Sequence, residues 1–157
     1  HAFTDDQNLQ DNSHSDLRRA RAASHNLVPT TTGAAISTTD TIPELKGLFD
    51  GLAVRAPVIS GSISDITAVL KKNVTVEEVN QAFIEASQLP KWQGILAVTN
   101  EPLVSSDIIG RPESAIVDLS LTQVVDGDMV KIFAWYDNEY GYSNRLVEQV
   151  INVGKNL

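Results

Sequence analysis

Asp126-Gly127-Asp128 separates two apolar runs, at 115–125 and 129–137, that the sequence predicts as strands. Glycine adopts a positive φ at little cost, so this tripeptide favours a tight turn between two antiparallel strands. Helical patterns lie before and after this predicted hairpin. Hairpin strands with interspersed helices indicate an α+β fold, in which a largely antiparallel mixed sheet is covered on one face by helices.

Further strands are predicted at 52–58, 62–70 and 94–100. In the first of these, alternation places four apolar residues on one side: Leu52, Val54, Ala56 and Val58. Because successive strand residues point to opposite faces, Arg55 is expected on the other, polar side.

The segment 76–88 is predicted to be an amphipathic helix. Thr75 and Glu78 form a Thr-x-x-Glu capping box, in which each side chain satisfies a backbone N–H at the start of the helix. Apolar residues follow at helical spacing: Val79, Ala82, Phe83 and Ala86. This spacing predicts one buried helix face.

Two more helices are predicted, at 34–46 and at 143–157. The first is expected to stop near Gly47. Ser143 is a suitable N-cap for the second, which forms a C-terminal helix.

The composition limits the classes of protein to consider. With 157 residues and 42% hydrophobic content, the chain can bury a core, and we expect a single domain over 1–157. The net charge of −8 disfavours a specific nucleic-acid binder, and no apolar stretch is long enough for a membrane span. Because the chain has no cysteine, it has no disulfide, thiolate metal site or cysteine nucleophile of its own, and we expect no metal site.

Three features could bind anions: the basic cluster Arg18, Arg19 and Arg21, the lone Arg55, and Thr31-Thr32-Gly33 before a helix. A guanidinium donates two parallel hydrogen bonds to a phosphate, and a helix start offers free N–H groups. Each feature also has an ordinary explanation. The arginines could be solvated or salt-bridged, and the Thr-Thr-Gly segment could serve only as a helix cap.

The N-terminal segment opens at His1 without an initiator methionine, and we expect further residues upstream. The His1 imidazole could act as a general base or acid near neutral pH. Two alternatives are a frayed terminus with no role and a copper site completed by His14 or His25. Residues 2–16 are polar and lack a period, which predicts a long functional or interface loop, and 17–24 are helix-prone.

Seven sequence blocks, in order and spanning essentially the whole chain, resemble phosphorylating glyceraldehyde-3-phosphate dehydrogenase. They are His1-Ala-Phe-Thr, Asp16-Leu-Arg-Arg-Ala-Arg-Ala-Ala, Pro29-Thr-Thr-Thr-Gly-Ala-Ala, Pro43-Glu-Leu-Lys-Gly, Pro102-Leu-Val-Ser-Ser-Asp, Val125-Asp-Gly-Asp-Met-Val-Lys and Trp135-Tyr-Asp-Asn-Glu-Tyr-Gly-Tyr-Ser-Asn. The chain is similar to the C-terminal catalytic domain of that family.

The resemblance implies a reaction and a set of site residues. In the family, a cysteine attacks an aldehyde, hydride passes to a nicotinamide cofactor, and inorganic phosphate cleaves the resulting thioester. His1 matches the histidine that activates the cysteine. Thr4 and Arg55 match residues that hold the substrate phosphate, and Thr32 and Gly33 match the site of the attacking phosphate.

The remaining matches concern the attacking phosphate and the cofactor. Arg19 is assigned to the attacking-phosphate site, although the neighbouring Arg18 is an alternative. Asn138, Glu139 and Tyr142 match the stretch beside the nicotinamide. The cofactor implied is NAD, with NADP possible, because Asn12-Ser13 stands where many NAD-specific relatives carry Leu-Pro.

The chain also departs from the family pattern. The cysteine motif is absent, and no G-x-G-x-x-G marks a nucleotide-binding Rossmann domain. We therefore expect the isolated chain to be inactive and to bind no cofactor tightly. An erythrose-4-phosphate dehydrogenase fragment is an alternative.

The resemblance further implies a cytoplasmic homo-oligomer, tetrameric in the family, with residues 2–26 as an interface loop. Apolar surface near 143–157 leaves a second alternative, a non-catalytic, self-associating assembly module.

Overall fold

The computed structural model describes residues 1–155 and divides the chain into two compact units, His1–Ile59 and Ser60–Leu157. Each unit is described by itself. The expectation of a single domain over 1–157 stays a prediction. The last two residues of the helix predicted at 143–157 lie outside the described residues.

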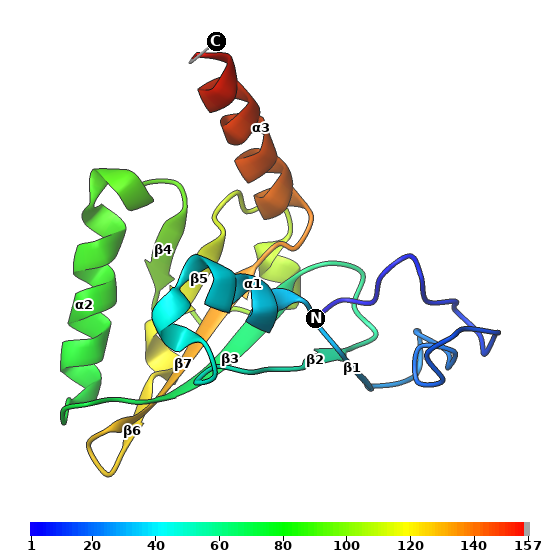
Figure 1. Ribbon diagram of the computed structural model, residues 1–157, viewed down its shortest axis with the longest axis horizontal. Coiled ribbons are helices and arrows are strands. Elements are labelled where there is room, and N and C mark those ends of the chain that lie inside the picture. Colours follow the sequence, from blue (N-terminus) through cyan, green and yellow to red (C-terminus); the bar gives the residue numbers. More distant parts are fainter. Residues whose placement is uncertain (156–157) are drawn as a thin grey trace. The chain divides into compact units, whose positions relative to one another are not determined.

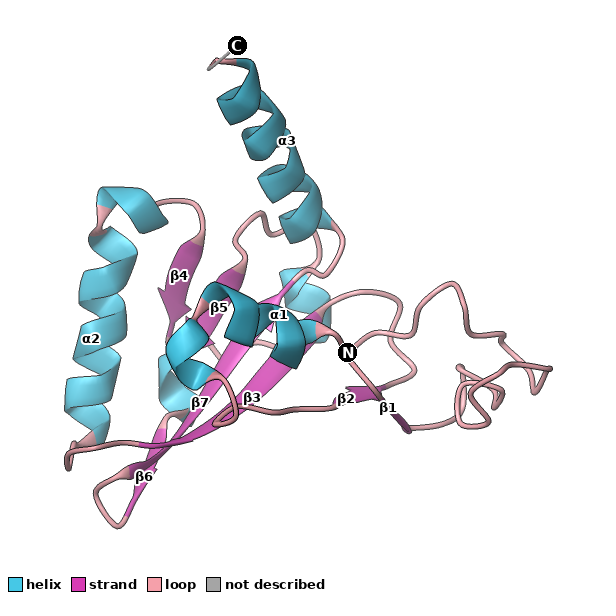
Figure 2. Cartoon of the chain, viewed as in Figure 1, coloured by secondary structure: helices cyan, strands magenta, loops and turns pink. Residues whose placement is uncertain are grey.

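The first unit is built largely of loops around a two-stranded sheet (Figure 2). Strand β1 (Val28–Thr30) pairs antiparallel with β2 (Ala53–Arg55). The segment at 52–58 is thus a strand over only three residues, and β1 was not predicted. Ala2 adds an isolated parallel bridge to Ala56, which lays the start of the chain alongside β2.

Burial around β2 does not follow the apolar alternation at 52–58. Leu52 and Val54 are 67% and 42% exposed. The Arg55 side chain is only 13% exposed. A two-stranded sheet has no second layer to cover its apolar side, whereas polar residues of the N-terminal loop cover Arg55.

The predicted helix at 34–46 is interrupted. Helix α1 covers Ala34–Thr41, and a 3₁₀ helix covers Pro43–Leu45. Ile42 between them has φ −122° and ψ 83°, because a residue before proline is disfavoured in the α region. Residues 17–24, predicted as helix-prone, form turns, whereas 2–16 form the expected loop.

The second unit contains a five-stranded sheet whose main path is β3 (Ser62–Val69), β7 (Met129–Tyr136), β5 (Ala115–Asp118) and β4 (Leu96–Thr99). The β4–β5 pair is parallel, and the other pairs are antiparallel. The predicted α+β fold with a largely antiparallel mixed sheet is confirmed.

The predicted hairpin forms between β6 (Gln123–Val125) and β7, with Val125 opposite Met129. Asp126 and Gly127 have the positive φ values, 53° and 80°, that the turn needs. The run 115–125 is not one strand, because a 3₁₀ helix at Leu119–Leu121 divides it. The Asp118 carboxylate caps that helix by accepting from the Ser120 N–H.

Helix α2 (Val76–Gln88) has the predicted bounds and the predicted capping box between Thr75 and Glu78. Phe83 and Ile84 of α2 pack against the core of the sheet, formed by Val117, Leu119 and Ala134. Figure 1 shows α2 lying along the sheet.

Helix α3 (Tyr140–Gly154) starts three residues before the predicted cap. Ser143 lies inside the helix and donates to the Glu139 carbonyl. The start is held instead by buried Asp137, whose Oδ1 accepts from the N–H groups of Glu139 and Tyr140. None of the helices within residues 1–155 combines the length and apolar character needed to cross a membrane.

Candidate functional site

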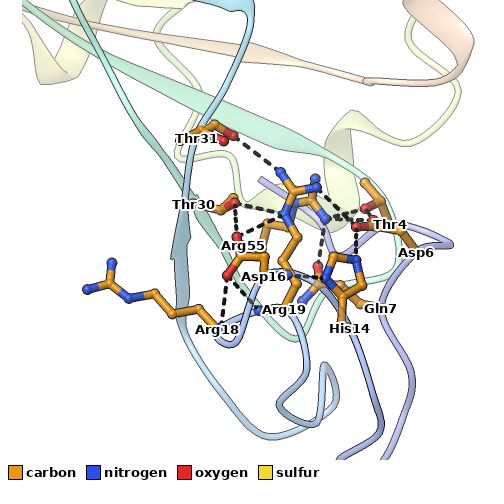
Figure 3. Close-up of polar contacts among 10 residues, drawn as sticks. All are labelled: Thr4, Asp6, Gln7, His14, Asp16, Arg18, Arg19, Thr30, Thr31 and Arg55. Atoms are coloured by element: carbon orange, nitrogen blue, oxygen red, sulfur yellow. Dashed lines mark hydrogen bonds and ion pairs between the residues drawn. The ribbon is translucent and has the colours of Figure 1, made fainter.

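Arg55 is the centre of a polar cluster in the first unit (Figure 3). Its Nη1 donates to the Thr4 hydroxyl at 2.5 Å, to Asp6 Oδ1 at 2.8 Å and to Gln7 Oε1 at 3.1 Å. Strand β2 positions Arg55, and the bridge between Ala2 and Ala56 aligns the start of the loop with this strand. The structure therefore brings Thr4 and Arg55 together.

Arg19 joins the same cluster from the loop before β1. Its Nε donates to the Thr30 hydroxyl at 2.8 Å, its Nη1 to Asp6 Oδ2 at 3.1 Å, and its Nη2 to the Thr31 carbonyl at 3.4 Å. Arg19 thus reaches from Asp6 to the segment that contains Thr32.

Asp6 lies between the two arginines. The hydrogen bond from Thr4, with the hydrogen bond and charge of Arg55 and the charge of Arg19, outweighs desolvation and lowers the pKa of Asp6 to about 2. His14 Nε2 lies 3.4 Å from Asp6 Oδ2. Asp6 is therefore a carboxylate at neutral pH with cationic or N–H partners on both oxygens.

Arg18 and Arg21 behave differently from Arg19. Figure 3 shows the Arg18 guanidinium extending away from the Thr4–Arg55 contact. Arg21 pairs with Asp11 at 3.0 Å, and both side chains are exposed. Of the three arginines in this run, Arg19 is the one that contacts Asp6 within the described chain.

Thr32 and Gly33 precede α1. The Thr32 hydroxyl accepts from the N–H of Ala34, the first residue of α1, at 3.2 Å, whereas Gly33 holds the N-cap position without a side-chain cap. Gly33 is exposed, and a Cβ there would meet nothing within 4 Å. An open hollow of about 780 Å³ in this unit is lined in part by Arg18, Thr31 and Thr32, whereas Thr4 and Arg55 do not line it.

His1 lies against β2. Its backbone nitrogen is 3.0 Å from the Val54 carbonyl oxygen, and its carbonyl accepts from the Ala56 N–H at 2.8 Å. The ring Nδ1 is 2.6 Å from the Ala2 carbonyl, which can only accept, so Nδ1 is the donor. In the neutral ring, Nε2 then carries the lone pair that a general base needs.

Asn138, Glu139 and Tyr142 lie in the second unit, at the junction of β7 and α3. Asn138 Oδ1 accepts from the Ser62 hydroxyl at 3.1 Å. Glu139 and Tyr142 are exposed. No group of three or more His, Asp or Glu side chains within residues 1–155 could hold a metal ion.

The sequence analysis missed Asp6, Gln7 and Thr30, and it considered His14 only as a copper ligand. One feature of the sequence could have indicated Asp6: a carboxylate two residues from Thr4 needs a cationic partner if the loop is partly buried. Nothing in the sequence indicated Gln7, which is 6% exposed. Its Nε2 is buried and has no hydrogen-bond partner within the described residues.

Comparison with known proteins identifies the family. A model of the glyceraldehyde 3-phosphate dehydrogenase C-terminal domain matches residues 1–138. Glyceraldehyde-3-phosphate dehydrogenase from Mycobacterium avium is 54% identical over 157 residues, which cover 100% of this chain and 46% of that protein. Glyceraldehyde-3-phosphate dehydrogenase 2 from Streptomyces avermitilis is 50% identical over 157 residues, with 100% and 47% covered.

Glyceraldehyde-3-phosphate dehydrogenase from Streptomyces coelicolor is 52% identical over 157 residues, which cover 100% of this chain and 47% of that protein. The chain therefore spans a little under half the length of these curated relatives. With the match over residues 1–138 and the fold described above, the chain belongs to the family of glyceraldehyde 3-phosphate dehydrogenase C-terminal domains.

Proposed function

We propose that this chain provides the phosphate-binding and proton-transfer half of a phosphorylating glyceraldehyde-3-phosphate dehydrogenase, which converts an aldehyde, phosphate and NAD into an acyl phosphate and NADH. The observation that carries the proposal is the cluster in which Arg55 and Arg19 share Asp6, with Thr4 on Arg55 and Thr31 on Arg19. The two guanidinium groups share one carboxylate, so the cluster gathers two phosphate-binding side chains in one place.

Thr4 and Arg55 hold the phosphate of the sugar-phosphate substrate in this proposal. The hydrogen bonds of the Arg55 side chain to Thr4, Asp6 and Gln7 are all donated by Nη1, on one edge of the guanidinium; its Nε and Nη2 lie on the opposite edge. These two nitrogens form the fork that binds phosphate oxygens in parallel. Arg19, Thr32 and Gly33 hold the attacking inorganic phosphate, since Arg19 bonds to Thr31 and the Gly33 backbone is open to a ligand.

His1 is the proposed general base and acid, acting through Nε2. Asn138, Glu139 and Tyr142 are the proposed cofactor-side residues. The Asn138 carboxamide fits the nicotinamide amide, because its oxygen is occupied by Ser62 and its NH₂ can donate. NAD, when bound, supplies the hydride acceptor, and NADP is a possible substitute. In this proposal the chain contributes only the residues beside the nicotinamide to the cofactor site. The chain has no cysteine, so the cysteine nucleophile of the reaction must come from outside it.

The further expectations are a cytoplasmic location, a tetrameric assembly with residues 2–26 at an interface, and no turnover by the isolated chain. Removing a catalytic nucleophile alone can lower kcat on the order of 10⁶-fold. An aldehyde-oxidation assay of the pure 157-residue chain checks the last point, and measurable turnover would contradict it.

The phosphate sites are tested by titrating the chain with inorganic phosphate and following backbone amide NMR signals. Arg55→Met should weaken binding about tenfold or more, because it removes the proposed fork. Arg21→Met is the matched control, since the exposed Arg21 pairs with Asp11 outside the cluster. Equal binding by all three chains would exclude the proposed phosphate site.

A second candidate function, a self-associating assembly module, is favoured by the apolar surface of α3. Five of its residues are about half exposed or more: Leu146, Val147, Val150, Ile151 and Val153. Apolar surface of this kind on a helix favours association. Light scattering of the chain distinguishes the candidates, and a monodisperse monomer would exclude the module.

A further inference from the structure

The polar cluster around Arg55 and Arg19 already contains a negatively charged side chain, Asp6. Asp6 Oδ1 lies 2.8 Å from Arg55 Nη1, and Asp6 Oδ2 lies 3.1 Å from Arg19 Nη1. Asp6 is the one carboxylate within residues 1–155 that contacts both arginines. We propose that Asp6 is a resident counter-anion whose charge weakens the affinity of this cluster for phosphate. This inference rests on the proposed phosphate-binding function.

The formal charges of the cluster balance. Arg19 and Arg55 contribute two positive charges, while Asp6 and Asp16 contribute two negative ones, with Asp16 Oδ2 3.6 Å from Arg19 Nε. His14 Nδ1 accepts from the Asp16 N–H at 2.9 Å, and His14 Nε2 lies 3.4 Å from Asp6 Oδ2. The two carboxylates therefore offset the positive charge of the two arginines that an incoming phosphate meets.

The geometry of Arg55 lets a ligand and Asp6 occupy the same guanidinium together. Thr4, Asp6 and Gln7 all contact Nη1, which leaves the edge formed by Nε and Nη2 for a ligand. Phosphate can bind that edge without displacing Asp6, so the repulsion between the two anions persists in the complex.

Gln7 is a second observation that points to a ligand here. Its Oε1 accepts from Arg55, and its buried Nε2 has no hydrogen-bond partner within the described residues. A buried donor without an acceptor is costly, and an oxyanion beside Arg55 would be such an acceptor.

The repulsion from Asp6 increases with the charge of the ligand. Asp6 should therefore weaken binding of the phosphate dianion more than binding of a monovalent anion such as formate. The consequence is a phosphate site from which reactant and product dissociate readily, although two arginines contribute to it.

The experiment measures the Kd of inorganic phosphate for the 157-residue chain by amide NMR at low ionic strength. Asp6→Asn keeps a hydrogen-bond acceptor and removes the charge, and it should bind phosphate about tenfold more tightly. The gain should shrink at high salt and be smaller for formate. Asp6→Glu, which keeps the charge, should stay close to the wild-type Kd.

Asp5→Asn is the matched control, because it removes the same charge from an exposed neighbouring residue. It should change the Kd by less than about twofold, since an exposed charge is screened. If the Asp6→Asn chain does not give a dispersed spectrum, Asp16→Asn replaces it and should tighten binding about threefold.

The outcomes separate this inference from the proposed function. Unchanged or weaker binding by a folded Asp6→Asn chain, or an equal gain in Asp5→Asn, would overturn the role of Asp6 if Arg55→Met still weakened phosphate binding. If the Arg55→Met chain binds phosphate with the wild-type Kd, the proposed phosphate site itself is excluded.

Discussion

Thr4 and Arg55 are 51 positions apart in the sequence, yet Arg55 Nη1 lies 2.5 Å from the Thr4 hydroxyl oxygen. The backbone explains this contact. The Phe3 N–H donates to the Val58 carbonyl, and Ala2 bridges to Ala56, so the first residues run parallel to β2. A short stretch of backbone pairing thus places a loop hydroxyl beside a strand arginine.

Asp6 should make the stability of the first unit depend on acid pH. Its pKa is lowered from 3.8 to about 2, so it stabilises the folded state above about pH 4 and loses this contribution as the pH falls toward 2. Because the side chain is partly exposed, the contribution is on the order of 1 kcal/mol. Urea unfolding at pH 6 and pH 2.5 should show a smaller pH-dependent loss in Asp6→Asn than in Asp5→Asn.

Gly61 is predicted to tolerate no side chain. Its φ is +87°, and a Cβ there would lie 2.5 Å from the Ser105 carbonyl oxygen. Gly61→Ala should therefore lower the free energy of unfolding by about 3 kcal/mol, from backbone strain and overlap together.

The control for Gly61 is Gly110→Ala. Gly110 has a similar φ, +82°, but a Cβ there would meet nothing within 4 Å, so the expected loss is about 1 kcal/mol. Equal losses in the two variants, measured by urea unfolding, would show that the contact with Ser105 is unimportant.

The capping box of α2 should contribute measurably to stability. Thr75→Ala and Glu78→Ala each remove a cap contact of 3.2 Å or 2.8 Å and should each cost about 1 kcal/mol. Glu77→Ala in the same first turn leaves the box intact and should cost less. A double variant with fully additive losses would contradict reciprocal capping.

The sequence predicted an element well where one short segment contained all the residues that determine it. The Thr75–Glu78 box and the apolar spacing after it are contained in one segment, and α2 has the predicted bounds. The Asp126-Gly127 turn needs only positive φ values, and it too formed. In contrast, Ser143 resembles a cap, but Asp137 fulfils that role from outside the helix.

The site was predictable only in part because its contacts are long-range. The resemblance selected Thr4, Arg19 and Arg55, and the structure places all three around one carboxylate. Asp6 lies in a loop without a period, so no sequence pattern linked it to both arginines. The burial of Arg55 on β2 has the same origin, since alternation does not show which side of a strand other residues cover.

Helix α3 should govern self-association of the chain. Val150 is 66% exposed within an apolar surface, so Val150→Asp should lower the apparent mass by light scattering if this surface mediates association. Gln149→Asp introduces the same side chain at the adjacent position and should leave the mass unchanged. A wild-type chain that is already monomeric would contradict the prediction.

The contacts of Asp6 with Arg55 of β2 and with Arg19 of the loop also affect the conformational entropy that ligand binding would cost. A segment rich in polar residues normally gains order only when a partner arrives, and that ordering subtracts from the affinity. Here the carboxylate immobilises both guanidinium groups during folding. The two guanidinium groups are consequently preorganised, and in the proposed function an oxyanion that binds them has little conformational disorder left to remove.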